Sequence, residues 1–192
     1  MSHEDINKII ELYKKVSALQ IEAYWETIIF SYQWWILVLG SIILWGVWIR
    51  LVDRRHLHII ILVGFMTSML AILLDDFGLS LVLWIYPYML TPLTGRLNVV
   101  DLAIIPVVYM LLYQYAKRWK TYLINLFLLC LFAGFVAEPV FEKLNLYITL
   151  KWEHWYSIPI YFMIGIFVKV SADKLDRHVR TQSNGVDRSA KK

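Results

Sequence analysis

The stretch LLDDFGLSLVLWIYPYMLTP, from Leu73 to Pro92, decides how this chain is threaded. Two adjacent aspartates, Asp75 and Asp76, end one apolar run, and a second apolar run begins almost at once. The second run, residues 79–90, would as a helix cover roughly 18 Å of a bilayer core about 30 Å thick. Because that is too short for a crossing, we expect residues 77–95 to form an outer-face or re-entrant element. A sixth, tilted span is the alternative.

The composition around this stretch indicates a membrane protein. The 192 residues are 59% hydrophobic and only 18% charged, whereas soluble domains are about 25% charged. Long apolar blocks alternate with short charged clusters, which is typical of a polytopic helical membrane protein, and the alternation of a membrane β-barrel is absent. We therefore predict an all-α integral membrane protein, a bundle of about five transmembrane helices with an N-terminal amphipathic helix.

The apolar blocks divide the chain into three parts. Residues 1–26 are expected to form an amphipathic helix at the membrane surface, with Ser2 as its N-cap. Residues 27–172 form the transmembrane bundle, and residues 173–192 a polar cytoplasmic tail, expected to be disordered from Thr181 onward. The expected spans are 27–49, 57–74, 98–115, 121–137 and 157–171.

The basic residues predict an orientation. With five spans, thirteen of the 19 Lys and Arg residues fall on the side that holds the C-terminus. The positive-inside rule makes the richer side cytoplasmic, so the N-terminus is expected outside and the C-terminus inside. The net charge of +4 is explained by this topology, and no nucleic-acid partner is expected.

With this threading, an acidic layer lies near the outer ends of the spans. Asp101 lies about one turn inside its span, and such groups usually face the bundle interior. Asp75 continues a helical stripe of small residues, the kind of surface on which helices approach closely, so it should point inward. The ligand-binding candidates are Asp75, Asp101, Glu138, His154, Trp155 and Tyr156. The weaker candidates, which simple solvation also explains, are Glu26, Asp76 and Arg96.

Several chemical motifs were tested against the sequence. DDFGL begins like the DDxxD of soluble prenyl-diphosphate enzymes, but its fifth position is Leu79. His56 and His58 lack further ligands for a metal site and suit a solvated loop. The single cysteine, Cys130, excludes an intramolecular disulfide and a CxxC motif. No nucleotide-binding, hydrolase or metalloprotease motif is present, so no metal, no cofactor and no catalytic residue is predicted.

Three features together resemble a known family. They are the segment WEHWYSIPIY, Trp152 to Tyr161, the acidic pair that ends an earlier span, and Glu138 followed by Pro139. The chain resembles a family of small polytopic membrane proteins that is common in endospore-forming bacteria and has no established activity. The resemblance implies a bacterial cytoplasmic membrane and no catalytic residue. A fainter likeness to small membrane terpene and carotenoid cyclases rests on no matched motif.

These observations leave three functions open. The leading hypothesis is a membrane protein that binds a lipid or small ligand in an outward-facing acidic and aromatic pocket. The alternatives are an intramembrane enzyme acting on an isoprenoid or lipid by carboxyl general-acid chemistry, and a small transporter or channel subunit. A transporter would need polar groups below the acidic layer, for which Gln33 and Asn125 are candidates. The expected partners are the lipid bilayer and a lipid or isoprenoid ligand, and a homo-oligomer is left open.

Overall fold

The protein is an all-α bundle, and in the part of the chain that the structure describes four helices are long and apolar enough to cross a membrane. A computed structural model describes residues 2–92 and 99–189. The α-helices are α1 (His3–Ala23), α2 (Tyr32–Leu51), α3 (Leu57–Ser80), α4 (Ile105–Tyr115), α5 (Trp119–Phe132), α6 (Glu138–Lys143) and α7 (His154–Ser189). A 3₁₀ turn, η2 (Arg54–His56), joins α2 to α3, and π-helical turns occur at η1 (Tyr24–Ile28), η3 (Val100–Ile104) and η4 (Ala133–Ala137). The fifth apolar helix, Val100–Tyr115, is shorter than the other four.

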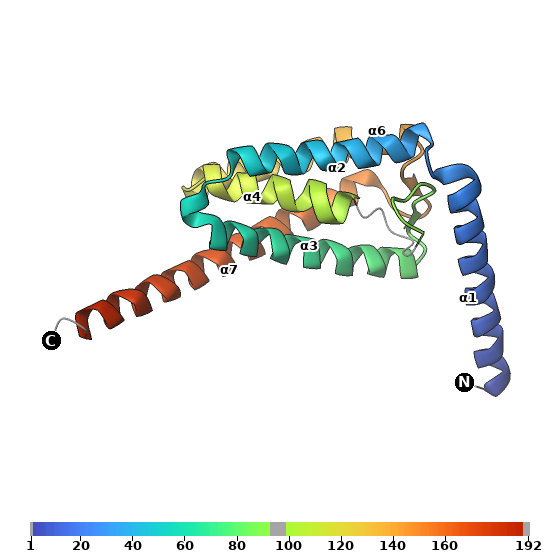
Figure 1. Cartoon of the computed structure of the whole chain (residues 1–192), viewed down its shortest axis with the longest axis horizontal. Coiled ribbons are helices and arrows are strands. Elements are labelled where there is room, and N and C mark those ends of the chain that lie inside the picture. Colours follow the sequence, from blue (N-terminus) through green and yellow to red (C-terminus); the bar gives the residue numbers. More distant parts are fainter. Residues whose placement is uncertain (1, 93–98, 190–192) are drawn as a thin grey trace.

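The first helix, α1, lies crosswise at one end of the bundle, as Figure 1 shows. Ser2 caps it as predicted: the Asp5 amide donates to the Ser2 hydroxyl at 3.1 Å, and the Ser2 amide donates back to the Asp5 carboxylate at 2.9 Å. None of its residues is buried. At its far end, the Tyr24 hydroxyl donates to the Leu90 carbonyl at 2.9 Å, which ties this end of α1 to the loop that follows α3.

The bundle itself is built around α3, α4, α5 and α7. Helix α4 contacts α3 and α5, and α7 contacts the same two helices from the other side. Their facing side chains form one large core that includes Ile60, Val63, Met110 and Tyr122. Helix α2 packs against η3 and α4, and most of its apolar side chains stay exposed, as expected for a surface that meets lipid.

Three prolines lie near the same end of the bundle. Pro106 and Pro139 each follow a π-helical turn, and Pro159 lies inside α7. Proline has no N–H to donate to the carbonyl four residues earlier, so the preceding turn rearranges. The carbonyl of Leu102, four residues before Pro106, instead accepts the Trp45 indole N–H at 3.2 Å. The turn before Pro106, η3, contains Asp101, and the turn before Pro139, η4, leads directly into Glu138.

Helix α3 corrects one expected boundary. The span was expected to end at Leu74, before the aspartates, but the helix continues through Asp75 and Asp76 to Ser80. Hydrogen bonds from Val82 N to Leu79 O and from Leu83 N to Gly78 O then close it as a Schellman motif. Val82 takes the left-handed position of this motif, with a φ of 55°, although glycine is usual there. Backbone hydrogen bonding rather than the two charges therefore ends the helix.

The chain after α3 folds back over the end of the bundle. Strand β1 (Trp84–Ile85) pairs antiparallel with β2 (Ile148–Thr149), which lies between α6 and α7. The amides of Leu150 and Lys151 also donate to the Leu83 carbonyl, at 2.9 and 3.0 Å. Up to Pro92, the described part of the 77–95 element therefore contains no second crossing helix. Residues 93–95 lie outside the described residues.

Helix α7 corrects the expectation of a disordered tail. The structure is helical from His154 to Ser189, past the expected end of the span at Ser171 and through most of the expected tail. The segment contains no proline after Pro159, so a helix already nucleated in the bundle can continue at little cost. Its last turns project beyond the bundle at the end opposite α1 (Figure 1).

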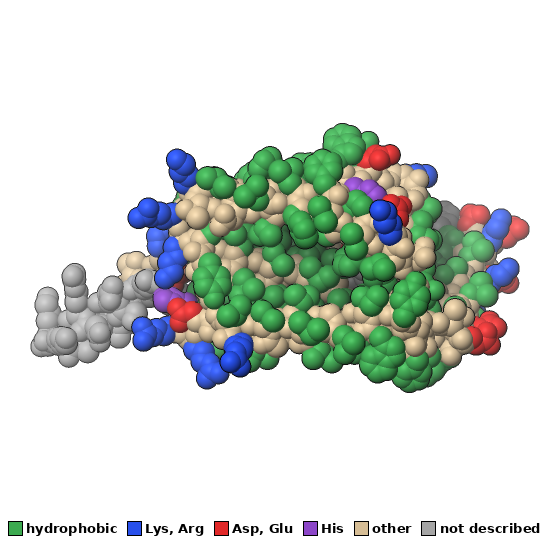
Figure 2. Space-filling model, turned by 90° about the horizontal axis from the view of Figure 1, so that it is seen from above, with side chains coloured by type: hydrophobic (Ala, Val, Ile, Leu, Met, Phe, Trp, Pro, Cys, Tyr) green, Lys and Arg blue, Asp and Glu red, His purple; other side chains and the backbone are tan. Residues whose placement is uncertain are grey.

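The surface is hydrophobic along its middle and charged at its ends. On the face shown in Figure 2, hydrophobic side chains cover the middle, Lys and Arg gather at the end from which α7 projects, and acidic side chains gather mainly at the other end. This distribution matches the arrangement of a protein that spans a bilayer with its charges in the two aqueous layers.

Candidate functional site: an acidic and aromatic cavity

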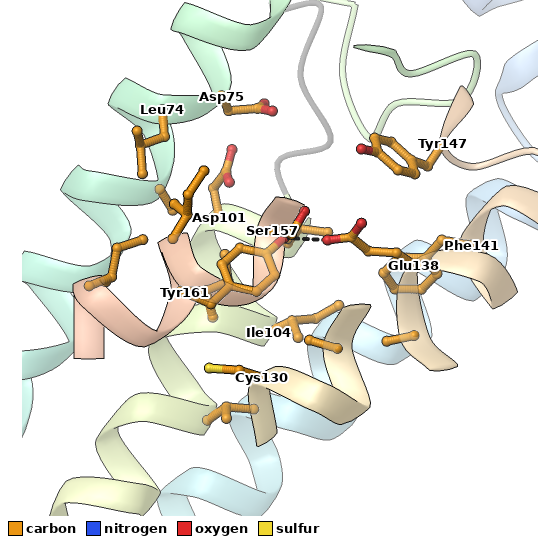
Figure 3. Close-up of a pocket in the computed structure, with 18 of the residues that line it drawn as sticks. Leu74, Asp75, Asp101, Ile104, Cys130, Glu138, Phe141, Tyr147, Ser157 and Tyr161 are labelled. Carbon is orange, nitrogen blue, oxygen red and sulfur yellow. Dashed lines mark hydrogen bonds between the residues drawn. The ribbon is translucent and has the colours of Figure 1, made fainter. Parts of the chain in front are cut away.

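A cavity of about 370 Å³ lies among α3, α4, α5, α6 and α7 at the end of the bundle nearer α1. Its volume is within the range of small-molecule sites in proteins. Asp75, Asp101 and Glu138 all line it, and they come from α3, η3 and α6. In Figure 3 the carboxyl groups of these three residues point into one space. The bundle thus brings together three acidic side chains that are far apart in the sequence.

All three carboxyl groups are buried. Their side chains are 6%, 4% and 8% exposed for Asp75, Asp101 and Glu138 respectively. Asp75 faces inward because it continues the buried stripe of Gly64, Thr67 and Ala71 along α3. Carboxyl groups within a membrane-spanning bundle are costly to place and usually mark a functional site.

Asp75 also holds the segment that folds back over the cavity. Its Oδ1 atom accepts the indole N–H of Trp84 at 2.9 Å and the hydroxyl of Tyr86 at 2.7 Å. Burial, and then the charge of Asp75, raises the pKa of Tyr86 well above its ordinary value, so this phenol stays protonated and keeps donating. We call residues 83–86 together with Tyr147 and Trp152 the roof of the cavity.

Aromatic rings hold the roof together. Trp84 stacks edge-on against Trp152, with ring centroids 5.1 Å apart, and Tyr86 lies 5.7 Å from Tyr147. Burial, followed by the charges of Glu138, Asp75 and Glu142, raises the pKa of Tyr147 well above its ordinary value, so it too remains a neutral phenol. The roof therefore adds several electron-rich ring faces to the acidic layer.

The Glu138 carboxyl group lies against the hydroxyls of Tyr161 and Ser157. Its Oε1 atom accepts the Tyr161 hydroxyl at 2.8 Å, whereas its buried Oε2 atom has no hydrogen-bond partner among the described residues. Glu138 begins α6 directly after a π-helical turn, and Pro139 follows it. Figure 3 shows its carboxyl group directed toward Tyr161 and the cavity.

Below the acidic layer the cavity is apolar. Its deeper wall includes Leu112, Leu126, Leu129 and Ile164, together with the buried thiol of Cys130. The two polar residues considered for a path through the bundle do not line it: Gln33 is buried in α2, and Asn125 is exposed on α5. The cavity is thus polar at its outer level and apolar beneath.

The remaining sequence candidates lie elsewhere. The Nε2 atom of His154 lies 3.3 Å from a carboxylate oxygen of Glu142, outside the cavity. Trp155 and Tyr156 are exposed, at 55% and 38%. Glu26 is exposed on η1, and Asp76 is half-buried and does not line the cavity. The sixth of these candidates, Arg96, lies outside the described residues.

Sequence reasoning missed most of the aromatic lining. Trp84, Tyr86, Tyr147, Trp152, Ser157 and Tyr161 all line the cavity. Ser157 and Tyr161 could have been found, because they are four residues apart on one helix and so share a face with Ile164. Trp84 and Tyr147 are brought there by the pairing of two short strands, for which the sequence carries no local signal.

In residues 2–92 and 99–189, no group of three or more His, Cys, Asp or Glu side chains is arranged to hold a metal ion.

The chain was compared with known proteins. No protein-family model matches the chain, no curated protein matches it, and no solved structure matches it.

Proposed function

We propose that this chain is a multi-pass membrane protein that binds a lipid or a small apolar ligand in the cavity between α3, α4, α5, α6 and α7. The observation that carries the proposal is the layering of this cavity. Three buried carboxyl groups lie at one level, and an apolar wall lies below them. An amphiphile, with a polar head and a hydrocarbon tail, has the same two-part character.

The surroundings support a ligand that comes from the bilayer. Phe77 of α3 and Phe132 of α5 both line the cavity and are 62% and 57% exposed on the hydrophobic flank of the bundle. The roof, in contrast, is tied down by the two bonds to Asp75. The apolar deeper wall argues against the transporter alternative, which needs polar groups along a continuous path.

Native mass spectrometry of the purified protein tests this proposal. Ala137→Phe places a ring at a position that lines the cavity, whereas Val136→Phe makes a similar change at a neighbouring exposed position. We expect the parent and Val136→Phe to carry co-purified or added lipid, and Ala137→Phe to carry roughly tenfold less. A parent without bound lipid, or equal binding by all three proteins, would reject the proposal.

The enzyme alternative is supported by one contact. The Tyr161 hydroxyl donates to the Glu138 carboxyl group at 2.8 Å inside the cavity, and a carboxyl so placed could transfer a proton to a bound isoprenoid or lipid. Incubating a membrane lipid extract with the parent and with Glu138→Gln tests this. A product formed only by the parent would favour an enzyme, and unchanged lipids in both samples would reject it.

We also propose a bacterial cytoplasmic membrane with the N-terminus outside and the C-terminus in the cytoplasm. The orientation is supported by the positive-inside rule and by the Lys and Arg residues at the α7 end in Figure 2. The cavity would then open toward the outer leaflet. The choice of membrane is supported only by the family resemblance of the WEHWYSIPIY segment.

A further inference from the structure

The basic end of the bundle shows how this chain stabilises a buried ammonium group. Lys169 is only 2% exposed, and its Nζ atom lies 4.9, 5.1 and 4.8 Å from the ring centroids of Tyr113, Trp119 and Tyr122. The carboxylate of Asp173 lies 3.5 Å away. Three ring faces and one carboxylate thus surround one cation, an arrangement that favours ammonium groups away from water.

The cavity offers the same kinds of group at the other end of the bundle. Glu138 supplies a carboxylate, and Tyr147, Trp152 and Tyr161 supply aromatic rings at the same cavity. Tyr147 and Tyr161 converge with Glu138 in Figure 3. In the described part of the chain no Lys or Arg lines this cavity.

Glu138 itself points to a ligand. It is more than nine-tenths buried, it lines the cavity, and its Oε2 atom has no hydrogen-bond partner in residues 2–92 and 99–189. A buried carboxylate oxygen without a partner is costly, and a hydrogen-bond donor or a cation removes that cost. The neighbouring ring faces attract a cation and offer nothing comparable to an anion.

We infer that the ligand of this cavity is a cationic amphiphile, whose ammonium group is held by Glu138 and the rings of Tyr147, Trp152 and Tyr161, and whose hydrocarbon chain lies against the apolar deeper wall. The inference rests on the proposed function and deepens it by naming the ligand class. It predicts selectivity by head-group charge among molecules that share one tail.

Three probes with the same ten-carbon tail test this selectivity: decyltrimethylammonium, nonionic decyl tetraethylene glycol ether and decyl sulfate. Each is titrated by native mass spectrometry into the protein in a sugar-based detergent. We expect decyltrimethylammonium to bind at least roughly tenfold more tightly than the other two. Glu138→Gln should remove most of this preference and leave the nonionic probe unaffected.

Glu142→Gln is the matched control, since Glu142 lies on the same short helix but faces His154 outside the cavity. It should bind all three probes like the parent. Thermal unfolding shows whether each variant is folded. If Glu138→Gln does not fold, Tyr147→Leu carries the test, because it removes a ring face and should weaken binding of the cationic probe alone.

The outcomes separate this inference from the proposed function. Equal binding of the cationic and nonionic probes by the parent would leave cavity binding standing and overturn the ammonium inference. Tighter binding of decyl sulfate would overturn it as well. If the parent binds none of the probes and carries no lipid, both the inference and the proposed function fail.

Discussion

Asp75 and Asp76 are adjacent in the sequence but differ in what their side chains do. Asp75 is buried, lines the cavity and accepts hydrogen bonds from Trp84 and Tyr86 in the roof. Asp76, one residue and about 100° further around the helix, is half-buried and does not line the cavity. The two aspartates should therefore respond differently to the same substitution.

Replacing Asp75 by Ala should destabilise the protein by about 2 kcal/mol, because two donors of the roof lose their common acceptor. Asp75→Asn should cost less, since its amide oxygen can still accept. Asp76→Ala is the control and should cost less than either Asp75 variant. Thermal unfolding in detergent measures all three, and equal losses for Asp75→Ala and Asp76→Ala would show that the bonds to the roof do not contribute.

At the scale of single elements, replacing a glycine by alanine should have opposite effects on stability in helices α3 and α2. A Cβ atom at Gly78 of α3 would overlap the Trp84 ring, whereas one at Gly40 of α2 would meet nothing within 4 Å. Gly78→Ala should therefore lose about 1 to 3 kcal/mol by displacing the roof. Gly40→Ala should gain about 0.5 to 1 kcal/mol from helix propensity. Unfolding midpoints of both variants check the signs, and a stabilising Gly78→Ala would contradict the packing of Trp84 on α3.

The cap of the short turn η2 should make the stability of the protein depend on pH. Asp53 caps it: its carboxylate accepts the Arg55 amide at 3.0 Å and lies 2.9 Å from His56 Nδ1. The bond to His56, followed by the bond to the Arg55 amide, lowers the pKa of Asp53 below its ordinary value of 3.8. A lowered pKa gives stability that is present above pH 3.8 and is lost as the pH falls through the lower folded value.

Asp53→Asn should therefore be less stable than the parent at neutral pH. The difference should shrink as the pH falls below 3.8. Unfolding temperatures of the two proteins across this range give the measurement. A difference that stays constant with pH would show that the Asp53 charge has no part in the cap.

The elements also show which local features can be predicted from sequence. Apolar length located the long helices, and Ser2 located the start of α1, because both signals are local. The end of α3 was wrong, since two charges look like a boundary although the helix keeps its hydrogen bonds through them. The pairing of β1 with β2 joins residues more than 60 positions apart through two residues each, and no nearby pattern indicates it.

At the scale of the whole molecule, the orientation can be tested with a reporter that is active only in the cytoplasm. The proposed five-span threading puts most Lys and Arg residues on the side of the C-terminus, so fusions after Lys120 and after Lys192 should be active. A fusion at Lys151 should be inactive, since Lys151 lies beside the roof at the opposite end. Activity at Lys151 and none at Lys120 would reverse the proposed orientation.

The acidic residues of the cavity could be predicted from the sequence because their positions depend on how the whole chain is threaded. Parity of the spans brings the ends that carry Asp75, Asp101 and Glu138 to the same side, so their proximity follows from threading alone. Which aromatic side chains complete the site depends on rotation of each helix and on the roof. This is why Trp155 and Tyr156 were expected in the site, whereas Trp152 and Tyr161 line it.

Helix α7 has a mechanical consequence. Its 36 residues make a rod about 54 Å long, which exceeds a bilayer core of about 30 Å. The same rod carries Tyr161 at the cavity, Lys169 among its three rings, and the turns that project past the bundle. A force on the projecting end of α7 would therefore be transmitted along this one helix to the part of the cavity wall that α7 forms.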